Sequence, residues 1–202
     1  MSASPGDLAA LGAIVQRFAG RRIAVLGDCM VDRYLWGRVE RISPEAPVPV
    51  VEIERESDTL GGSGNVAANL RALGAEPLLL GVVGDDETGR RLREALAARG
   101  LDLRGLATDP ERPTTVKTRI VAHAQQVART DRESRAEVAG GALAALLAVV
   151  ERELPGCAGL VVSDYGKGVV HPGTLAPALA ASRAAGIPVS VDPKESHIDA
   201  YR

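Results

Sequence analysis

Aromatic side chains are scarce in this chain of 202 residues, because Phe, Trp and Tyr together make up only 2% of it. A core without large rings must be built from Ala, Val, Leu and Ile, and the apolar share of the chain is 46%. That share, with 25% charged residues, is ordinary for a globular protein. A chain of this length can bury roughly 70% of its unfolded surface, so we expect a full core.

Cysteine is also rare. The two that are present, Cys29 and Cys157, lie far apart and fit no metal or redox spacing. This argues against a disulfide framework and favours a reducing compartment, the cytoplasm. The first 20 residues include Asp7 and Arg17 and lack the continuous apolar stretch of a signal peptide. No 18 apolar residues run together, so we expect no membrane span.

The chain has no basic block. Its formal net charge is −2, and its arginines are interleaved with acidic residues, as on solvated helix faces. Nucleic acid is therefore not expected as the main partner.

Apolar segments alternate with helical patterns along most of the chain. The patterns predict strands at 23–27, 78–83, 159–163 and 187–191, and helices at 7–18, 65–74, 86–99, 135–152 and 172–185. Repeated strand–helix units predict an α/β fold with a parallel sheet and right-handed crossovers. A β-rich segment at 48–53 and a hairpin formed by 114–122 and 126–130 break this rhythm. We interpret them as a small β-structure set apart from the main sheet, acting as a lid.

Three glycines, Gly61, Gly62 and Gly64, precede a helical pattern and let backbone amides approach a ligand. The spacing matches a dinucleotide motif, but that motif follows a hydrophobic strand, and residues 54–59 are too polar for one. A P-loop is excluded because no Gly-Lys-Ser/Thr follows. A structural turn, with Asn65 as helix N-cap, is the plain alternative.

Acidic side chains follow several predicted strands. Asp28 and Asp32 come after the first strand, Asp164 after 159–163, and Asp192 after the last. The carboxyl ends of strands in an open α/β sheet are where ligands bind, so these groups predict a polar cleft. A carboxylate that accepts hydrogen bonds from paired hydroxyl groups suits a sugar.

The order of the motifs carries a family resemblance. The motifs are Gly27-Asp28-x-x-x-Asp32, the string RISPEAPVPV at 41–50, Gly61-Gly62-x-x-Asn65, Gly84-Asp85-Asp86, Ser163-Asp164-Tyr165-x-Lys167-Gly168 and Val191-Asp192-Pro193-Lys194. Together they resemble the ribokinase-like (PfkB) carbohydrate kinases over nearly the whole chain from about residue 22. Within that family, the string at 41–50 is most similar to the D-glycero-β-D-manno-heptose-7-phosphate kinases, which feed ADP-heptose synthesis.

The resemblance implies a fold and a set of site residues. The fold would be a ribokinase-like three-layer α/β/α sandwich with a mainly parallel sheet and a small β-sheet lid. Residues 1–202 would form a partial kinase domain with lid segments at about 38–58 and 112–131. The substrate-binding residues would be Asp28, Asp32, Gly61, Gly62, Asn65, Lys117, Arg119 and Arg129, the last three meeting the phosphate of the sugar. The nucleotide side of the cleft would hold Asp164, Lys167 and Lys194.

Each of these residues has a structural alternative. Asp28 is as well placed to orient a loop as to touch a ligand, and Asp32 to cap a turn. Lys117, Arg119 and Arg129 could instead be solvated side chains on a surface strand. Asp164 and Lys167 suit helix capping or a structural ion pair. Cys29 is expected as a buried filler, and the three histidines, His123, His171 and His197, as surface residues.

The resemblance also implies a reaction, in which ATP, assisted by Mg²⁺, phosphorylates the anomeric hydroxyl of a heptose 7-phosphate. The family's base is the aspartate of a Gly-Ala-Gly-Asp segment, and neither this segment nor the Asn-x-x-Glu motif occurs in the chain. We therefore expect no catalytic residue or metal ligand here, a missing C-terminal part, and no ATP turnover by residues 1–202 alone. A homodimer formed through the lid is expected. The alternatives are a non-catalytic sugar-phosphate-binding fragment and a nicotinamide-dependent oxidoreductase.

Overall fold

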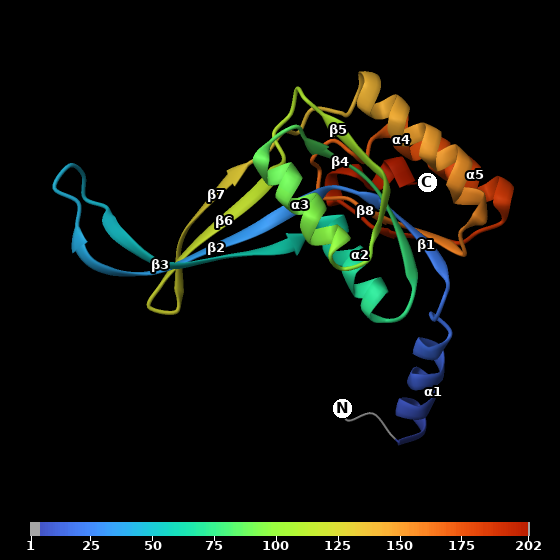
Figure 1. Ribbon diagram of the computed structural model, residues 1–202, viewed down its shortest axis with the longest axis horizontal. Helices are drawn as coiled ribbons and strands as arrows, with labels where there is room; N and C mark the ends of the chain where they lie inside the picture. The colour runs from blue at the N-terminus through green and yellow to red at the C-terminus, as the bar shows by residue number, and fades with distance from the viewer. Residues whose placement is uncertain (1–4, 202) are drawn as a thin grey trace.

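The computed structural model describes residues 5–201, which form an α/β body with a second sheet that extends from it (Figure 1). The helices are α1 (Pro5–Gln16), α2 (Gly62–Ala72), α3 (Glu87–Ala97), α4 (Gly140–Glu153) and α5 (Pro172–Ala185), with 3₁₀ turns η1 (Leu154–Gly156) and η2 (Glu195–Tyr201). The strands are β1 (Arg22–Gly27), β2 (Cys29–Ile42), β3 (Pro49–Gly61), β4 (Glu76–Gly84), β5 (Asp102–Asp109), β6 (Thr115–Ala122), β7 (Gln125–Arg132), β8 (Gly159–Ser163) and β9 (Val189–Asp192).

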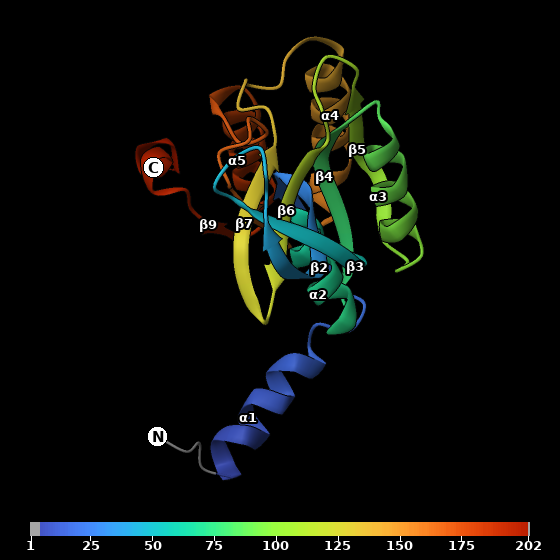
Figure 2. The same ribbon diagram turned by 90° about the vertical axis from the view of Figure 1, so that its left-hand side faces the viewer.

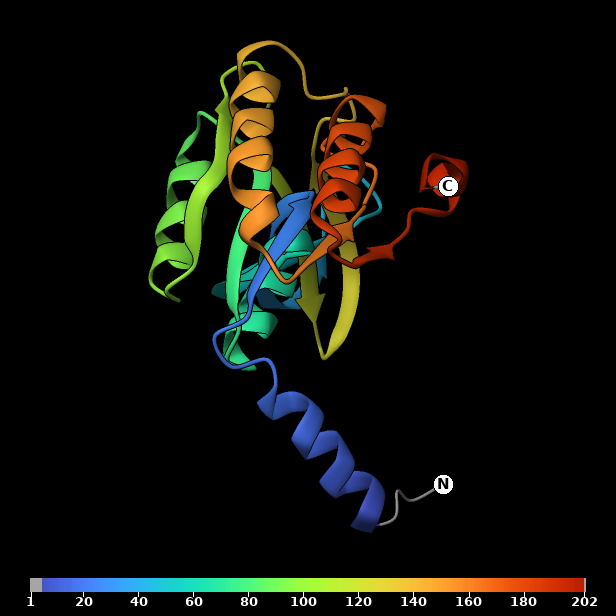
Figure 3. The same ribbon diagram turned by 90° about the vertical axis from the view of Figure 1, so that its right-hand side faces the viewer.

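Sheet A is the centre of the body, with strand order β5-β4-β1-β8-β9 and every neighbouring pair parallel. Helices α4 and α5 cover one face, and α2 and α3 cover the other (Figure 3). Because side chains alternate along a strand, Leu26 of β1 packs in the core beneath α4 and α5, while Val25 packs in the core beneath α2 and α3. The predicted three-layer α/β fold with a mainly parallel sheet is confirmed.

The two cores are aliphatic, as the composition predicts. The largest fully buried side chains in the described part of the chain are leucines, valines and Met30, with no aromatic ring among them. Cys29 is 3% exposed and packs in the core beneath α2 and α3, which confirms it as a buried filler. Burial raises the pKa of its thiol to about 12, so the sulfur stays protonated at neutral pH.

Sheet B is the second β-structure, with strand order β3-β2-β6-β7. Strands β2 and β6 are parallel, and the other two pairs are antiparallel. Figures 1 and 2 show it as a curved layer beside the body. The prediction of a β-structure set apart from the main sheet is confirmed, and sheet B also includes residues 29–37 and 59–61, outside the segments expected for it.

Strand β2 was not predicted, and β3 continues beyond the predicted segment at 48–53, through the polar residues 54–59 to Gly61. Cross-strand charge pairing explains this. The Arg33 guanidinium donates two hydrogen bonds of 2.8 Å to the carboxylate of Asp58, its register partner on β3. Opposite charges across a strand pair can stabilise a sheet that has no apolar face. The alternation of apolar and polar residues by which strands are predicted is therefore absent here.

One more strand was missed, and several element boundaries differ from the prediction by a few residues, such as α2 at 62–72 rather than 65–74. Strand β5 was missed because it is an edge strand whose fully buried stretch is short. Helix α4 begins at Gly140 rather than at 135, because the preceding residues lie against the loop after β8, where the Val138 amide donates to the Gly168 carbonyl at 2.9 Å. Strand β9 occupies 189–192 rather than 187–191.

Helix α1 extends away from the body in all three views, and Leu11, Ile14 and Val15 are exposed on it. Within residues 5–201, no helix combines the length and the apolar character needed to cross a membrane.

Glu153, at the end of α4, is a largely buried acid with a strongly lowered pKa, and its side chain is 11% exposed. Hydrogen bonds from Arg152, Arg22 and Arg104 lower its pKa to about 2. An unfolded glutamate titrates at about 4.3, so its stabilising contribution is complete above that pH and is lost as the pH falls towards about 2. We expect Glu153→Gln to lower the free energy of unfolding at pH 7, and the difference from the unsubstituted protein to shrink below about pH 4.5.

Urea unfolding of both proteins between pH 7 and pH 3 measures this. Glu151→Gln, an exposed glutamate on the same helix, is the matched control and should change little. A difference that stays constant with pH would show that the ionised Glu153 does not contribute.

Candidate functional site

The glycine loop joins the two sheets, since β3 ends at Gly61 and α2 begins at Gly62. Gly62 has φ +55°, and a Cβ at this position would overlap the carbonyl oxygen of Asp28. The Ser63 amide donates to that same carbonyl at 3.0 Å, and the Ser63 hydroxyl donates to the carbonyl of Gly27 at 3.1 Å. The loop is therefore fixed against the carboxyl end of β1 by the two hydrogen bonds of Ser63 and by the missing side chain of Gly62.

The geometry rules out Asn65 as the helix N-cap and the context of a dinucleotide motif, whereas a structural turn agrees with it. The N-cap of α2 is Gly61, so Asn65 lies one turn inside the helix with its side chain exposed, and its interpretation as an N-cap is wrong. The strand before the loop, β3, runs antiparallel to β2 in sheet B. A dinucleotide motif needs a parallel strand of the main sheet at this place, so its structural context is absent.

Asp28 holds the opposite side of the same junction. Its carboxylate accepts hydrogen bonds from the amides of Tyr165 at 2.8 Å, Lys167 at 3.0 Å and Val169 at 3.0 Å. The residue is 1% exposed, and burial raises its pKa against the opposing effect of these bonds. Asp28 therefore orients the loop after β8 with its side chain and the glycine loop with its carbonyl.

Asp32 lies on β2, beside Gly61. One carboxylate oxygen accepts a hydrogen bond of 2.5 Å from the Arg119 guanidinium, which raises the pKa of Arg119. The second oxygen, Oδ2, points to the space that a Gly61 side chain would fill, 2.5 Å from the position of a Cβ there. The missing side chain thus leaves room beside this oxygen.

The register of sheet B brings Asp32 together with other charged residues on one face. Asp32 is opposite Lys117, which is opposite Asp131, and Arg119 is opposite Arg129. We call these five residues the charged face of sheet B. Asp131 lies 3.0 Å from the Arg129 guanidinium and 3.7 Å from the Lys117 ammonium. The structure thus gathers the three predicted phosphate-binding cations around two carboxylates.

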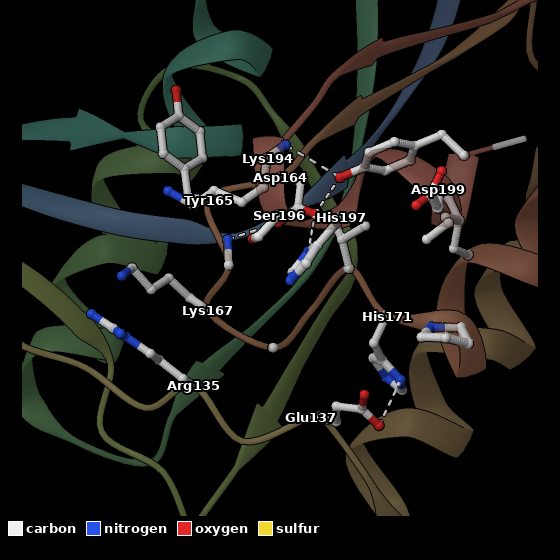
Figure 4. A pocket seen from close by; sticks show the side chains of 17 residues that line it. Arg135, Glu137, Asp164, Tyr165, Lys167, His171, Lys194, Ser196, His197 and Asp199 are labelled. Atoms are coloured by element: carbon white, nitrogen blue, oxygen red, sulfur yellow. Dashed lines mark hydrogen bonds and ion pairs between the residues drawn. The ribbon is translucent and has the colours of Figure 1, made fainter.

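A cavity of about 540 Å³ opens at the carboxyl ends of β8 and β9 (Figure 4). All three residues predicted for the nucleotide side, Asp164, Lys167 and Lys194, line it. Asp164 is fully buried, and its Oδ2 lies 2.7 Å from His197 Nδ1 and accepts a 2.5 Å hydrogen bond from the Tyr201 hydroxyl. The cavity therefore has a fixed acidic floor with cations around it.

Lys167 forms the structural ion pair that was its alternative. Its ammonium lies 2.7 Å from the Glu133 carboxylate, and both side chains are about nine-tenths buried. Burial raises the pKa of Glu133, but hydrogen bonds from Lys167 and Arg135 outweigh it and hold the pKa below its usual value. This pair joins the segment after β7 to the loop after β8.

The roles of several site residues were not predicted from the sequence. Glu133 pairs with a residue 34 positions later, and no local pattern indicates such a contact. The expectation of surface histidines is confirmed for His123 and for His197, whose side chain is 40% exposed, and it is wrong for His171. His171 has a side chain that is 8% exposed and caps α5 by accepting from the Gly173 amide, and His197 contacts Asp164. A histidine directly before Pro172 was the available signal for the cap.

The last feature of the candidate site is whether residues 5–201 could bind a metal ion. No group of three or more His, Cys, Asp or Glu side chains in that range is placed to hold a metal ion.

Comparison with known proteins shows which family the chain matches. Residues 21–202 match the model of the pfkB family of carbohydrate kinases. The chain is 47% identical over 193 residues to the bifunctional protein HldE of Caulobacter vibrioides and 49% identical over 181 residues to that of Geotalea uraniireducens. These alignments cover 95% and 90% of the chain, but 39% and 37% of the two relatives, so the chain spans about two fifths of their length.

Solved structures share the fold. A putative phosphofructokinase from Staphylococcus aureus gives a TM-score of 0.68 at 14% identity, covering 89% of this chain and 55% of that one. Arabidopsis thaliana ribokinase complexed with ribose and ATP gives 0.63 at 17% identity, covering 86% and 53%. At these identities the likeness shows the ribokinase-like fold alone.

Proposed function

Since this chain belongs to the pfkB family of carbohydrate kinases, we propose that it forms the sugar-binding part of a kinase that phosphorylates the anomeric hydroxyl of a heptose 7-phosphate with ATP. The product would serve ADP-heptose synthesis. The identity of 47% to 49% with two bifunctional HldE proteins supports this choice within the family, together with the string at 41–50.

The observation that carries the proposal is the second carboxylate oxygen of Asp32, Oδ2, which lies beside the missing side chain of Gly61. The Arg119 guanidinium holds one oxygen of this carboxylate, and the other oxygen can accept hydrogen bonds from sugar hydroxyls. Gly61 and Gly62 make room for the sugar, and Asn65, exposed on the first turns of α2, supplies an amide that both donates and accepts. Asp28, which is buried and bonded to three amides, positions these groups.

The phosphate of the substrate would meet the charged face of sheet B. Lys117 is the cation with the loosest partner there, at 3.7 Å from Asp131, and Arg119 and Arg129 form the next pair on the same face of the sheet. We propose that sheet B acts as a lid that brings these cations to the sugar phosphate.

The cavity at the ends of β8 and β9 would take the nucleotide. Its volume of about 540 Å³ is within the range of small-molecule pockets, and Lys194 supplies a cation for phosphate groups. Asp164 and Lys167 shape its floor through their own partners. The described residues offer no metal cluster, so Mg²⁺ enters the proposal only as the usual companion of ATP phosphates, and no step here depends on it.

The same proposal covers assembly and location. Sheet B has two free edges, β3 and β7, within the described chain, and Val48, Ile53 and Val127 are exposed on or beside them. Pairing of two such lids would cover these residues and give a homodimer. We place the protein in the cytoplasm, where ATP and sugar phosphates are available.

Isothermal titration of the purified chain with D-glycero-β-D-manno-heptose 7-phosphate tests the proposal. We expect saturable binding that is at least about tenfold tighter than for the heptose without phosphate, because charge-assisted bonds to the phosphate exceed neutral ones. Equal affinity for the two sugars, or no binding of either, would contradict it.

Two parallel assays separate the rivals. Release of ADP from ATP in the presence of the sugar phosphate would contradict our expectation that residues 1–202 lack turnover. We expect the chain to bind the sugar phosphate without releasing ADP. A non-catalytic sugar-phosphate-binding fragment would give the same result. The gene region after codon 202 distinguishes that fragment from part of a kinase. A change in NADH fluorescence on mixing would favour the oxidoreductase.

A further inference from the structure

Asp131 is an acid in the middle of the proposed phosphate site, where an acid should weaken binding. It lies on β7, opposite Lys117 in the register, and its side chain is 22% exposed. Its two carboxylate oxygens approach two cations of the charged face, with Arg129 at 3.0 Å and Lys117 at 3.7 Å. No other residue of the charged face pairs with two of its cations.

Lys117 is the less tightly held of these two cations. Its side chain is 15% exposed, and the distance of 3.7 Å to Asp131 exceeds that of a hydrogen bond. A largely buried ammonium group needs a negative partner, because desolvation disfavours its charge. Asp131 supplies that partner while no ligand is bound, yet the loose geometry leaves donors of Lys117 for an incoming anion.

We propose that Asp131 is a resident counter-anion that sets the selectivity of the charged face for a doubly charged phosphate. It competes with any anion for Lys117 and Arg129, so a singly charged anion gains little by replacing it. A phosphate dianion carries enough charge to take over both cations. This inference rests on the proposed function, since it assumes that the phosphate of the sugar reaches the charged face.

The test is Asp131→Asn, which keeps the shape of the side chain and removes its charge. The matched control is Asp58→Asn, which removes the carboxylate partner of Arg33 from the same sheet but outside the charged face. Titrations with inorganic phosphate at pH 8 and with nitrate, a monoanion, use probes of known charge. Thermal unfolding checks that each variant is folded.

For Asp131→Asn we expect phosphate and nitrate to bind about tenfold tighter or more, because a like charge within a few ångströms of the anion is removed. The ratio of the two affinities should fall, and Asp58→Asn should match the unsubstituted protein. Unchanged or weaker anion binding by a folded Asp131→Asn would overturn the proposal and leave Asp131 with a positioning role. If Asp131→Asn does not fold, the same titrations of Asp131→Ala decide in the same way.

Heptose 7-phosphate separates this inference from the function itself. Tighter binding of this sugar phosphate by Asp131→Asn than by the unsubstituted protein supports both. If the unsubstituted protein binds heptose 7-phosphate and Asp131→Asn binds it no more tightly, only the proposed role of Asp131 is overturned. Absence of binding in both proteins overturns the proposed function, and with it the site on which this inference depends.

Discussion

Asp28→Ala is expected to lower the free energy of unfolding by about 3–5 kcal/mol, because two buried backbone amides and one part-buried amide lose the carboxylate that accepts their hydrogen bonds. Each orphaned donor costs about 1–3 kcal/mol when water does not reach it. The residue is 1% exposed, so replacement by water is not expected without local opening of the loop after β8.

Urea denaturation followed by circular dichroism measures the change. Asp85→Ala is the control, because Asp85 is an exposed aspartate and its removal should change the free energy by less than about 0.5 kcal/mol. Asp28→Asn tests the same point with the shape kept, since its amide nitrogen would face backbone donors. An Asp28→Ala protein as stable as the Asp85→Ala control would show that the loop does not depend on this carboxylate.

Gly62→Ala is expected to have the second large effect, with a loss of at least about 3 kcal/mol and of sugar binding. Two causes add. The φ of +55° is strained for any residue with a Cβ, and that Cβ would overlap the Asp28 carbonyl, which also accepts from the Ser63 amide. The glycine loop must move away from β1, and Asp32 loses its neighbour.

Gly141→Ala provides a control of opposite sign. Gly141 lies in α4, and a Cβ there meets nothing within 4 Å. Alanine should therefore stabilise the helix by up to about 1 kcal/mol. If Gly62→Ala behaves like Gly141→Ala in denaturation and in titration with the sugar phosphate, the loop is not fixed as described.

The sequence predicts the body well where local signals coincide. Helix α5 is found at its predicted bounds, because Pro172 opens it and Gly186, with φ +67°, ends it. Strand β1 follows from its apolar run. Strand β2 and most of β3 escape prediction because their stability comes from pairs such as Arg33 with Asp58, which single-strand patterns do not reveal.

In the candidate site, too, some features could be predicted from the sequence and others depend on contacts between distant residues. Motif order brings Asp32, Gly61 and Gly62 to one place, and the structure places Asp32 beside Gly61. The partners that hold the site are distant in sequence, as with Asp28 and Val169 or Glu133 and Lys167, so their roles emerge only from the fold. This is why the sequence leaves Asp28 equally suited to orient a loop and to contact a ligand, whereas the structure shows it orienting the loop after β8.

The central claim is that Asp32 recognises the sugar and Lys117 its phosphate. The most direct test is titration of Asp32→Ala and Lys117→Ala with heptose 7-phosphate and with the unphosphorylated heptose. We predict that Asp32→Ala weakens both by about tenfold or more, and that Lys117→Ala weakens only the phosphorylated sugar. Unchanged binding of both sugars by Asp32→Ala, or an unchanged preference for the phosphate in Lys117→Ala, would contradict the account.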